Sequence, residues 1–346
     1  MAYTDIDKSS DYFEAKLYTG NGGTLNVTGL DFAPNWVWIK SRSSSRVHCL
    51  FDTVRGATKR LQTNEGDTEY TTSNSLTSFN SDGFSLGSYN QSNEGSANFV
   101  SWNWKAGTAV SGTTSGSGTG KAYSGSVNTD AGFSIIKYLG NGSAGHTIPH
   151  HLGAVVKMII LKRVDASSNW STYHVGMGNG KSLPINESEA PTTATSFWND
   201  TTPTSSVFTV GSISNTNSNN SSIIAYSFAD VKGYSKFGSY TGNGSTNGTF
   251  VYTGFKPAWV LVKKISGSAQ WQILDNKRDA YNPAITALFP DSSDADTTSY
   301  NTDFLSNGFK LRATTGSRNG SGSTYIYMAF AENPFVTSTG IPVLAR

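Results

Sequence analysis

The chain has 346 residues, enough for two or three domains, and its formal net charge of +2 lacks the basic character that nucleic-acid binding requires. Aromatic residues make up 12% of the chain, which excludes an intrinsically disordered protein because such proteins lack bulky apolar side chains. Cys49 is the only cysteine, so we exclude an intrachain disulfide and interpret Cys49 as a small buried residue. Because no apolar run approaches ~20 residues and the N-terminus lacks the regions of a secretory signal, we expect no membrane partner.

Residues 1–11 form an expected N-terminal arm, which precedes a pattern that occurs three times along the chain. In the first copy, residues 12–107, the pattern begins with Y-T-G-N-G at Tyr18 and continues with W-V-W-I-K, which ends at Lys40. It then includes H-C-L-F-D, which ends at Asp52, and closes on F-V-S-W-N-W. A repeat of about 100 residues exceeds the roughly 20–50 residues of solenoid units, so we interpret each copy as a duplicated domain.

A Gly/Ser/Thr-rich segment, residues 108–131, follows the first copy and is predicted to be a flexible linker that leaves this copy free to orient independently. The second copy spans residues 132–232 and the third spans residues 233–335, with a junction too short to act as a tether. A C-terminal tail, residues 336–346, completes the chain. We expect the arm and the tail to be mobile in the isolated protein and ordered against a partner chain. The positions that match Tyr18, Lys40 and Asp52 are Tyr138, Lys162 and His174 in the second copy, and Tyr240, Lys263 and Asp275 in the third.

Strand and turn patterns dominate every copy, whereas no window keeps the apolar spacing of a helix without a Gly, Pro or Asn-Gly interruption. The closing strands alternate between apolar and other residues, which predicts sheets that are packed on one face. N-G dipeptides at Asn21, Asn141 and Asn243 predict tight hairpins. We therefore predict an all-β chain of three tandem β-sandwich domains, jelly-roll or lectin-like, derived by internal duplication. Nine closing-strand residues are predicted to be buried in three separate cores: Val100, Trp102, Trp104, Ile224, Tyr226, Phe228, Ile326, Met328 and Phe330.

Motifs for nucleotide binding and hydrolysis are incomplete. The segment G-S-G-T-G-K, which ends at Lys121, has Ser115 and Ala122 where a Walker loop requires Gly and Ser or Thr. No G-x-S-x-G elbow is flanked by a strand and a helix, and no His recurs with a Ser partner, which argues against a Ser/His/Asp triad. The seven Glu residues do not recur between copies, which argues against a glycan-cleaving pair of carboxylates.

Two clusters contain residue types that bind metals. His146, His150 and His151 lie close together, but no carboxylate or Cys is near them in sequence, and we interpret the segment as a polar hairpin loop. The segment D-S-S-D-A-D from Asp291 has the short spacing of some calcium loops. Because it lacks the Gly of the turn and the downstream Glu of such a loop, we interpret it as a solvated loop.

Exposed aromatic residues could bind glycans by stacking on sugar rings. Most of the eight Trp and sixteen Tyr residues fall at predicted strand positions and are expected in the core. Trp198 lies in a predicted loop and is the best candidate for an exposed aromatic residue. The strand-ending Lys is interpreted as an exposed partner of Asp52 in the first copy and of Asp275 in the third, contributing about 0–1 kcal/mol, whereas His174 breaks this pattern in the second copy.

Five segments carry a resemblance to a known family: D-Y-F-E-A-K-L-Y-T-G-N-G, F-A-P-N-W-V-W-I-K-S-R-S, F-D-T-V-R-G-A-T-K-R-L, F-N-S-D-G-F-S-L-G and F-A-E-N-P-F. They resemble a repeated domain of marine tailed-phage virion proteins, and the resemblance extends from Asp11 to Phe335. It is strongest in the first copy; the second lacks R-G-A after His174 and D-G before Val207. The resemblance implies a virion structural or tail-fibre protein, and it implies no catalytic residues.

We therefore expect a non-enzymatic virion protein on the particle surface, either a head decoration, a head fibre or a tail-associated adhesin, which acts by multivalent assembly and display. The alternative is a carbohydrate-binding tail-fibre module that recognises a host surface glycan. We predict no catalytic, cofactor-binding or metal-binding residues and no cofactor. The expected partners are capsid or tail proteins, further copies of the chain in a homo-oligomer such as a trimer, and, in the alternative, a host glycan. The expected location is the virion, after synthesis in the host cytoplasm.

Overall fold

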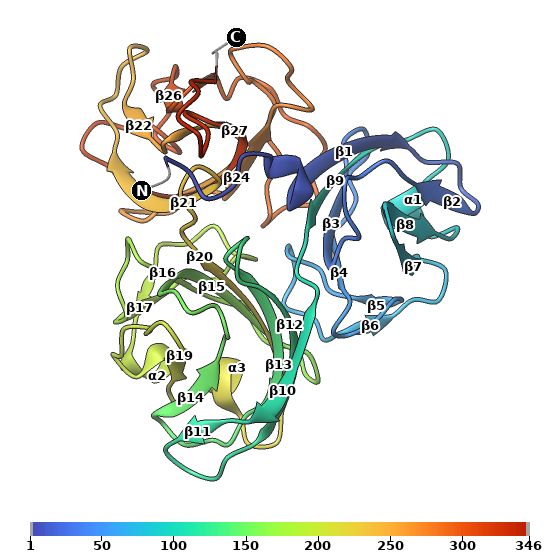
Figure 1. Cartoon of the computed structure of the whole chain (residues 1–346), viewed down its shortest axis with the longest axis vertical. Coiled ribbons are helices and arrows are strands. Elements are labelled where there is room, and N and C mark those ends of the chain that lie inside the picture. Colours follow the sequence, from blue (N-terminus) through green and yellow to red (C-terminus); the bar gives the residue numbers. More distant parts are fainter. Residues whose placement is uncertain (1–2, 344–346) are drawn as a thin grey trace.

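Antiparallel β-sheets make up the fold, which confirms the prediction of an all-β protein. The computed structural model describes residues 3–343, and the helical segments in this range are single turns of three or four residues (Figure 1). No helix in the same range is long and apolar enough to cross a membrane. The four helical turns of the described range are η1 Ser9–Asp11, α1 Asn90–Asn93, α2 Thr195–Trp198 and α3 Ser214–Asn217.

Each repeat contains a four-stranded sheet, which we call its main sheet. The strands of the three main sheets are β1 Phe13–Thr19, β3 Trp36–Ser41, β4 Cys49–Asp52 and β9 Asn98–Trp104; β13 Phe133–Leu139, β15 Val156–Arg163, β16 Ser171–His174 and β20 Ser222–Ala229; and β21 Ser235–Thr241, β23 Phe255–Lys264, β24 Gln272–Asp275 and β27 Thr324–Pro334. The strand order is β1-β9-β3-β4 in the first repeat, β13-β20-β15-β16 in the second and β21-β27-β23-β24 in the third. The three main sheets therefore share one topology.

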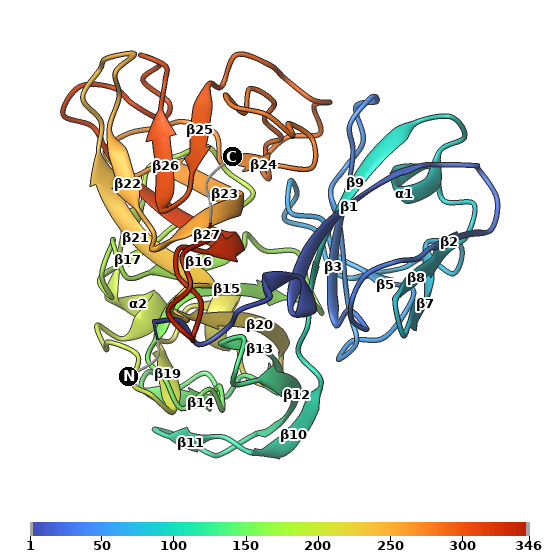
Figure 2. The ribbon, with the colours of Figure 1, turned by 45° about the horizontal axis from the view of Figure 1, so that its top comes forward.

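A small sheet covers the outer face of each main sheet (Figure 2). Its strands are β2 Leu25–Val27, β7 Leu76–Asn80 and β8 Gly83–Leu86; β14 His146–Pro149 and β19 Val207–Val210; and β22 Phe250–Tyr252, β25 Thr302–Leu305 and β26 Gly308–Leu311. In the first repeat, Val37 and Ile39 of the main sheet share an apolar cluster with Phe84 and Leu86 of the small sheet. Two-stranded ladders join β5 Lys59–Arg60 to β6 Tyr70–Thr71, and β17 Lys181–Ser182 to β18 Thr192–Thr193.

The inner faces of the three main sheets meet in one central apolar cluster. Trp36 of the first repeat stacks on Tyr226 of the second, with ring centroids 4.7 Å apart. Phe13 of the first repeat stacks on Phe330 of the third at 5.0 Å. All nine closing-strand residues are buried, as predicted, but they belong to this one cluster, so the prediction of three separate cores is wrong.

The error concerns which face of the closing strand packs against its own repeat. In the first repeat, Phe99 belongs to the cluster beneath the small sheet, and Ser101 and Asn103 follow it at intervals of two. The more apolar face, with Trp102 and Trp104, packs against the other repeats instead. Because both faces of the strand are buried, its polar alternation does not indicate a solvent-exposed side.

The Gly/Ser/Thr-rich segment is structured, contrary to the prediction of a flexible linker. Its strands are β10 Thr108–Thr113, β11 Ser115–Gly116 and β12 Ala122–Asn128. β10 and β12 extend the main sheet of the second repeat to six strands, and β11 pairs with β14. Small residues permit this close pairing, because a Cβ atom at Gly125 would lie 2.4 Å from the carbonyl oxygen of Ile135. Together with the central cluster, this pairing contradicts an independently oriented first repeat.

Both terminal segments pack on the chain itself. The Thr4 hydroxyl donates to the carbonyl of Lys232 at 2.7 Å, and Ile6 is buried in the central cluster. The Ser338 backbone N–H donates to the Asp7 carboxylate at 2.6 Å. The prediction of arms that need a partner for order is therefore wrong for residues 3–11 and 336–343. The same prediction for residues 1–2 and 344–346 lies outside the described residues.

The N-G turns form corners between sheets and do not form the predicted hairpins. Asn21, for example, lies between β1 of the main sheet and β2 of the small sheet. The buried Asn93 side chain donates to Asn21 Oδ1 at 3.1 Å and to the Gly23 carbonyl at 2.7 Å. The pairs Asn217 with Asn141 and Asn319 with Asn243 repeat this arrangement. The positive φ angles that the dipeptide favours are present, at 69° for Gly22.

The shared core predicts that the repeats unfold together. Phe330→Ala is expected to lower the free energy of unfolding by about 3–5 kcal/mol, because the side chain packs against aromatic rings of all three repeats. Guanidinium unfolding, followed by tryptophan fluorescence and far-UV circular dichroism, should show one transition for both probes. Tyr252→Ala, at a position with 61% exposure, is the control and should change the free energy by less than about 0.5 kcal/mol. Two separate transitions would contradict the shared core.

Candidate functional site

The strand-ending lysines are buried at the boundaries between repeats, where each ammonium donates to a carbonyl oxygen of another repeat. The pairs are Lys40 and Ser293 at 3.1 Å, Lys162 and Gly66 at 3.3 Å, and Lys263 and Ser188 at 3.0 Å. The first repeat thus binds the third, the second binds the first, and the third binds the second. Burial lowers the pKa of each of these lysines to about 8. The interpretation of these lysines as exposed partners of Asp is wrong.

A second set of contacts links the repeats in the same direction. The donors are ring nitrogens at the position four residues before Asp52, His174 and Asp275. The pairs are His48 Nε2 with the Phe289 carbonyl at 2.8 Å, Trp170 Nε1 with the Gln62 carbonyl at 3.0 Å, and Trp271 Nε1 with the Pro184 carbonyl at 3.0 Å. These contacts were not predicted, although an aromatic or His side chain recurs at this position of each repeat and could have indicated them.

The Asp/His/Asp position forms a third set, and it completes the ring of contacts. Asp52 Oδ2 accepts a hydrogen bond from the Tyr226 hydroxyl at 2.8 Å, which joins the first repeat to the second. His174 Nε2 donates to the Tyr327 carbonyl at 3.0 Å, which joins the second to the third. Asp275 Oδ2 accepts from Trp102 Nε1 at 3.0 Å, which joins the third to the first. The three sets of recurring polar side chains therefore all bond across repeat boundaries.

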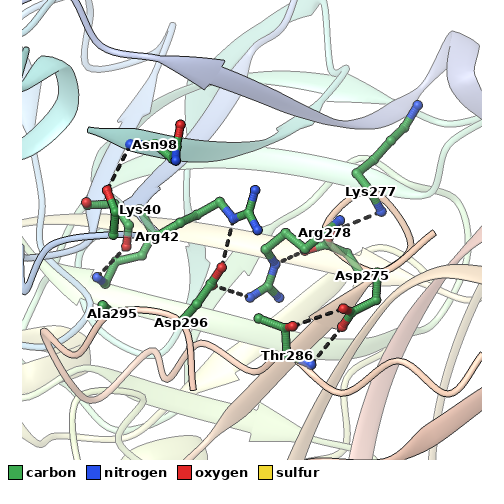
Figure 3. A network of polar contacts seen from close by, with 12 residues as sticks. Lys40, Arg42, Asn98, Asp275, Lys277, Arg278, Thr286, Ala295 and Asp296 are labelled. Atoms are coloured by element: carbon green, nitrogen blue, oxygen red, sulfur yellow. Dashed lines mark hydrogen bonds and ion pairs between the residues drawn. The ribbon is translucent and has the colours of Figure 1, made fainter. Parts of the chain in front are cut away.

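A network of buried charges surrounds the contact between the third and first repeats (Figure 3). Arg278 Nε donates to Asp275 at 2.6 Å, and Arg278 Nη1 donates to Asp296 at 3.0 Å. Arg42 of the first repeat donates to the same Asp296 carboxylate at 2.8 Å, so one carboxylate joins arginines of two repeats. Asp296 is the last residue of the D-S-S-D-A-D segment, which therefore contributes to an interface. In the first repeat, Arg55 pairs with Asp52 in the same way.

The two clusters of metal-binding residue types do not form metal sites. His146 Nδ1 lies 2.8 Å from Asn141 Nδ2, His150 Nε2 lies 3.2 Å from the Thr204 carbonyl, and His151 Nε2 lies 2.9 Å from the Tyr123 hydroxyl. His146 and His150 are buried, so the interpretation of a polar loop holds only for the exposed His151. Asp291 accepts from the Trp271 backbone N–H at 3.2 Å, and burial raises its pKa to about 7. Across residues 3–343, no three His, Cys, Asp or Glu side chains are close enough to hold a metal ion.

Trp198 is buried, contrary to its expected exposure. The α2 turn directs its indole inward, where Nε1 donates to the Lys181 carbonyl at 3.0 Å and the ring packs on Tyr173. The remaining seven Trp residues are also buried. The most exposed aromatic residues are instead three tyrosines: Tyr281 at 83%, Tyr3 at 62% and Tyr252 at 61%. The segment G-S-G-T-G-K, which was compared with a Walker loop, connects β11 to β12. Lys121 at its end donates from Nζ to Asn220 Oδ1 at 2.6 Å.

Two of these tyrosines line a groove of about 530 Å³ between the N-terminal segment, the end of β22 and the chain after β27. Tyr3, Tyr252 and Phe335 supply its aromatic surface. Asp230 and Lys236, also in the lining, pair with each other at 2.6 Å. Flat apolar rings beside polar groups suit a ligand with one apolar face, such as a sugar. The charged residues of the lining are Asp5, Asp230, Lys232 and Lys236.

The buried charge network predicts a strong effect of Asp275→Asn. The change leaves Arg278 buried with a weaker partner, so the free energy of unfolding should fall by about 3–5 kcal/mol. Asp303→Asn removes a pair with the partly exposed Arg312 and should cost about 0–1 kcal/mol. Guanidinium unfolding at pH 7 measures both variants. Equal small losses in the two variants would show that the buried network is not needed for stability.

The buried histidines predict a loss of stability in acid. His174 Nδ1 accepts the Gly176 N–H while Nε2 donates to Tyr327, so the neutral ring fits the site, and burial lowers its pKa to about 4. Since this folded-state pKa lies below the usual 6.5, the stabilisation is complete above pH 6.5 and is lost as the pH falls toward 4. The loss should be on the order of 3 kcal/mol.

His174→Gln tests this assignment, because the amide can still donate to Tyr327 but does not titrate. Chemical unfolding between pH 7 and pH 4 should show a shallower loss of stability for this variant than for the unchanged chain. His151→Gln, at an exposed position, is the control and should keep the original profile. Identical profiles for the chain and His174→Gln would contradict the role of His174.

Comparisons with known proteins identify the family of the chain. No curated protein and no solved structure matches it. The model of one family, described as "Domain of unknown function (DUF7483)", matches residues 8–334, a range that includes all three repeats and the segment between the first two. Because this match covers more than half of the sequence, the chain belongs to the DUF7483 family.

Proposed function

We propose that the protein is a non-enzymatic structural component of a tailed-phage particle. In this proposal it lies on the particle surface as a head decoration, a head fibre or a tail-associated adhesin. Its partners are capsid or tail proteins and further copies of the chain, and it reaches the virion from the host cytoplasm. The sequence resemblance supports the assignment to a phage particle. The recurring polar groups support a structural role, because they form hydrogen bonds between the repeats.

We also propose that the three repeats are β-sandwich domains that arose by internal duplication. Their main sheets have one strand order, and their small sheets cover equivalent faces. The recurrence extends to single hydrogen bonds, since Tyr18, Tyr138 and Tyr240 each donate to a main-chain carbonyl of the segment before the closing strand. A strand pattern alone does not require this tyrosine hydrogen bond. Its presence in all three repeats therefore favours duplication over independent origin.

The observation that carries the structural role is the closed ring of inter-repeat contacts. Each repeat uses the same donors toward one neighbour, which is a head-to-tail contact, and such contacts close when the rotation allows it. Here the third repeat bonds back to the first through Asp275 and Trp102, so the ring is complete within one chain. A ring closed in one chain does not depend on protein concentration, so it provides a fixed platform for display.

The carbohydrate-binding alternative is favoured by one observation, the groove beside the third repeat. Its exposed Tyr3 and Tyr252 could stack on a sugar, and these residues are outside the repeated contacts. Weak binding at each groove would be strengthened by display of many copies, with avidity gains of about 10²–10⁴. In this alternative, the same protein would be both a structural component of the particle and an adhesin.

The location on the particle is the decisive test. An antibody against the purified protein should label the outer surface of purified phage particles in immunogold images, and the chain should be present in many copies per particle by quantitative mass spectrometry. Absence of the chain from purified particles would reject the structural role. Binding of the purified protein to host surface polysaccharide, lost in Tyr252→Ala and retained in the exposed control Tyr281→Ala, would add the adhesin role. Cleavage of that polysaccharide would contradict the non-enzymatic proposal.

A further inference from the structure

The second repeat covers one side of its sheets with its own strands. β12 pairs with β13 along its length, from Tyr123 opposite Tyr138 to Asn128 opposite Phe133. β11 pairs with β14 of the small sheet. Residues 108–128 therefore close the edges of both sheets on the side where the chain enters the repeat, and Ile136 of β13 is fully buried beneath them.

The corresponding edges of the third repeat carry no such strands within residues 3–343. There β21 forms a ladder with β27 alone, apart from a single bridge between Ser235 and Val231, and β22 pairs with β26 alone. Register places Gly238 at the position of Ile136, since Gly238 lies opposite Tyr327 and Ile136 lies opposite Ala225 in the equivalent closing strands. Gly238 is partly exposed where Ile136 is buried. Figure 2 shows β21 and β22 next to each other on the left side of the molecule.

Backbone groups of β21 point toward the open side. The Gly242 N–H donates to the Ser323 carbonyl, so even-numbered residues of this strand face β27 and odd-numbered residues face away. The Phe237 N–H is capped by Asp230 Oδ1 at 2.9 Å. The open part of the edge therefore extends from the Phe237 carbonyl through both groups of Ser239 to the Thr241 N–H. Ser239 and Thr241 are exposed.

The first repeat closes its equivalent edge in a different way. Lys16 occupies the position of Gly238 and donates across the gap between its two sheets to the Gly29 carbonyl at 3.3 Å. Lysine on an edge strand opposes pairing with another chain. By contrast, residues 237–241 carry no charge, and the adjacent β22 exposes Phe250 at 43% and Tyr252 at 61%.

We propose that the β21 edge binds an extended segment of a partner protein, which adds one antiparallel strand where β12 lies beside β13. The partner segment is uncharged and contains small residues such as Ser, Gly and Ala, as β12 does, because the same edge geometry accepts those residues in the second repeat. Antiparallel pairing directs its C-terminal end past Phe237 toward Asp230 and Lys236, which line the 530 Å³ groove together with Tyr3 and Tyr252. Main-chain hydrogen bonds supply affinity and the groove supplies selectivity, as in other strand-addition complexes.

The test uses the unchanged protein and a synthetic peptide with the sequence of residues 122–129, A-Y-S-G-S-V-N-T. At saturating peptide, amide hydrogen exchange measured by NMR should slow by at least about tenfold at Ser239 and Thr241. Exchange at Leu17 and Thr19 of β1 should not change. Absence of protection at Ser239 and Thr241, or equal protection at β1, would overturn the proposal.

Two methylated peptides show whether protection comes from strand pairing. Ser124 lies opposite Lys137, whose backbone faces β12, so N-methylation at Ser124 should abolish protection. N-methylation at Gly125, whose N–H faces the other side, should preserve it. Equal behaviour of the two peptides would overturn the proposal, and neither requires a change to the protein.

A protein variant and a dilution series complete the experiment. Ser239→Pro removes the outward N–H and should lose peptide binding, whereas Leu17→Pro makes the matched change on β1 and should keep it. If the amides of β21 become protected as protein concentration rises without peptide, the occupant is a second copy of this chain. That result would overturn the assignment to a partner protein.

Discussion

The arrangement of the molecule depends on the need of each main sheet to bury two apolar faces. One face packs beneath its own small sheet, and the other, with residues such as Trp104 and Phe330, has no cover within its repeat. Three copies solve this problem together, because three such faces can meet at one centre and exclude water from all of them. The stability of a single repeat therefore depends on the other two. Residues 108–131 connect two repeats that pack against each other, so this segment does not act as a spacer between separate domains.

Polar contacts give this apolar association a defined geometry. Apolar contact alone is not directional, so it does not determine the rotation of one repeat against the next. The buried Lys263, Asp275 and Trp271 do so, because each needs a partner at hydrogen-bond distance once water is removed. A misrotated repeat would leave these groups without partners, and each would cost about 1–3 kcal/mol or more. The same requirement explains why Lys recurs at this position in all copies.

The sequence was sufficient to predict the repeats, the all-β class and the burial of the closing strands, because these depend on local periodicity. It was not sufficient to assign the faces, since Ser101 and Asn103 resemble exposed residues although they are buried. The linker was predicted incorrectly because Gly, Ser and Thr are typical of flexible segments. The pairing of Ser115–Gly116 with His146–Pro149 depends on a strand that lies beyond the end of the segment. Trp198 lies in a polar context, and only its tertiary position shows that the indole is buried.

The three repeats differ at their entry edges, and in our proposal this difference separates binding from assembly. The first repeat closes the gap with Lys16, the second with its own β-strands, and the third leaves it open at Gly238. Positions of the ring are more constrained, because Asp52, His174 and Asp275 differ in type but each still forms a hydrogen bond across a boundary. The edges are outside the ring, so they can change without loss of the core. An open edge that exposes uncharged backbone also favours aggregation. We therefore expect its persistence beside the exposed Tyr252 to reflect a partner that covers it in the assembled state.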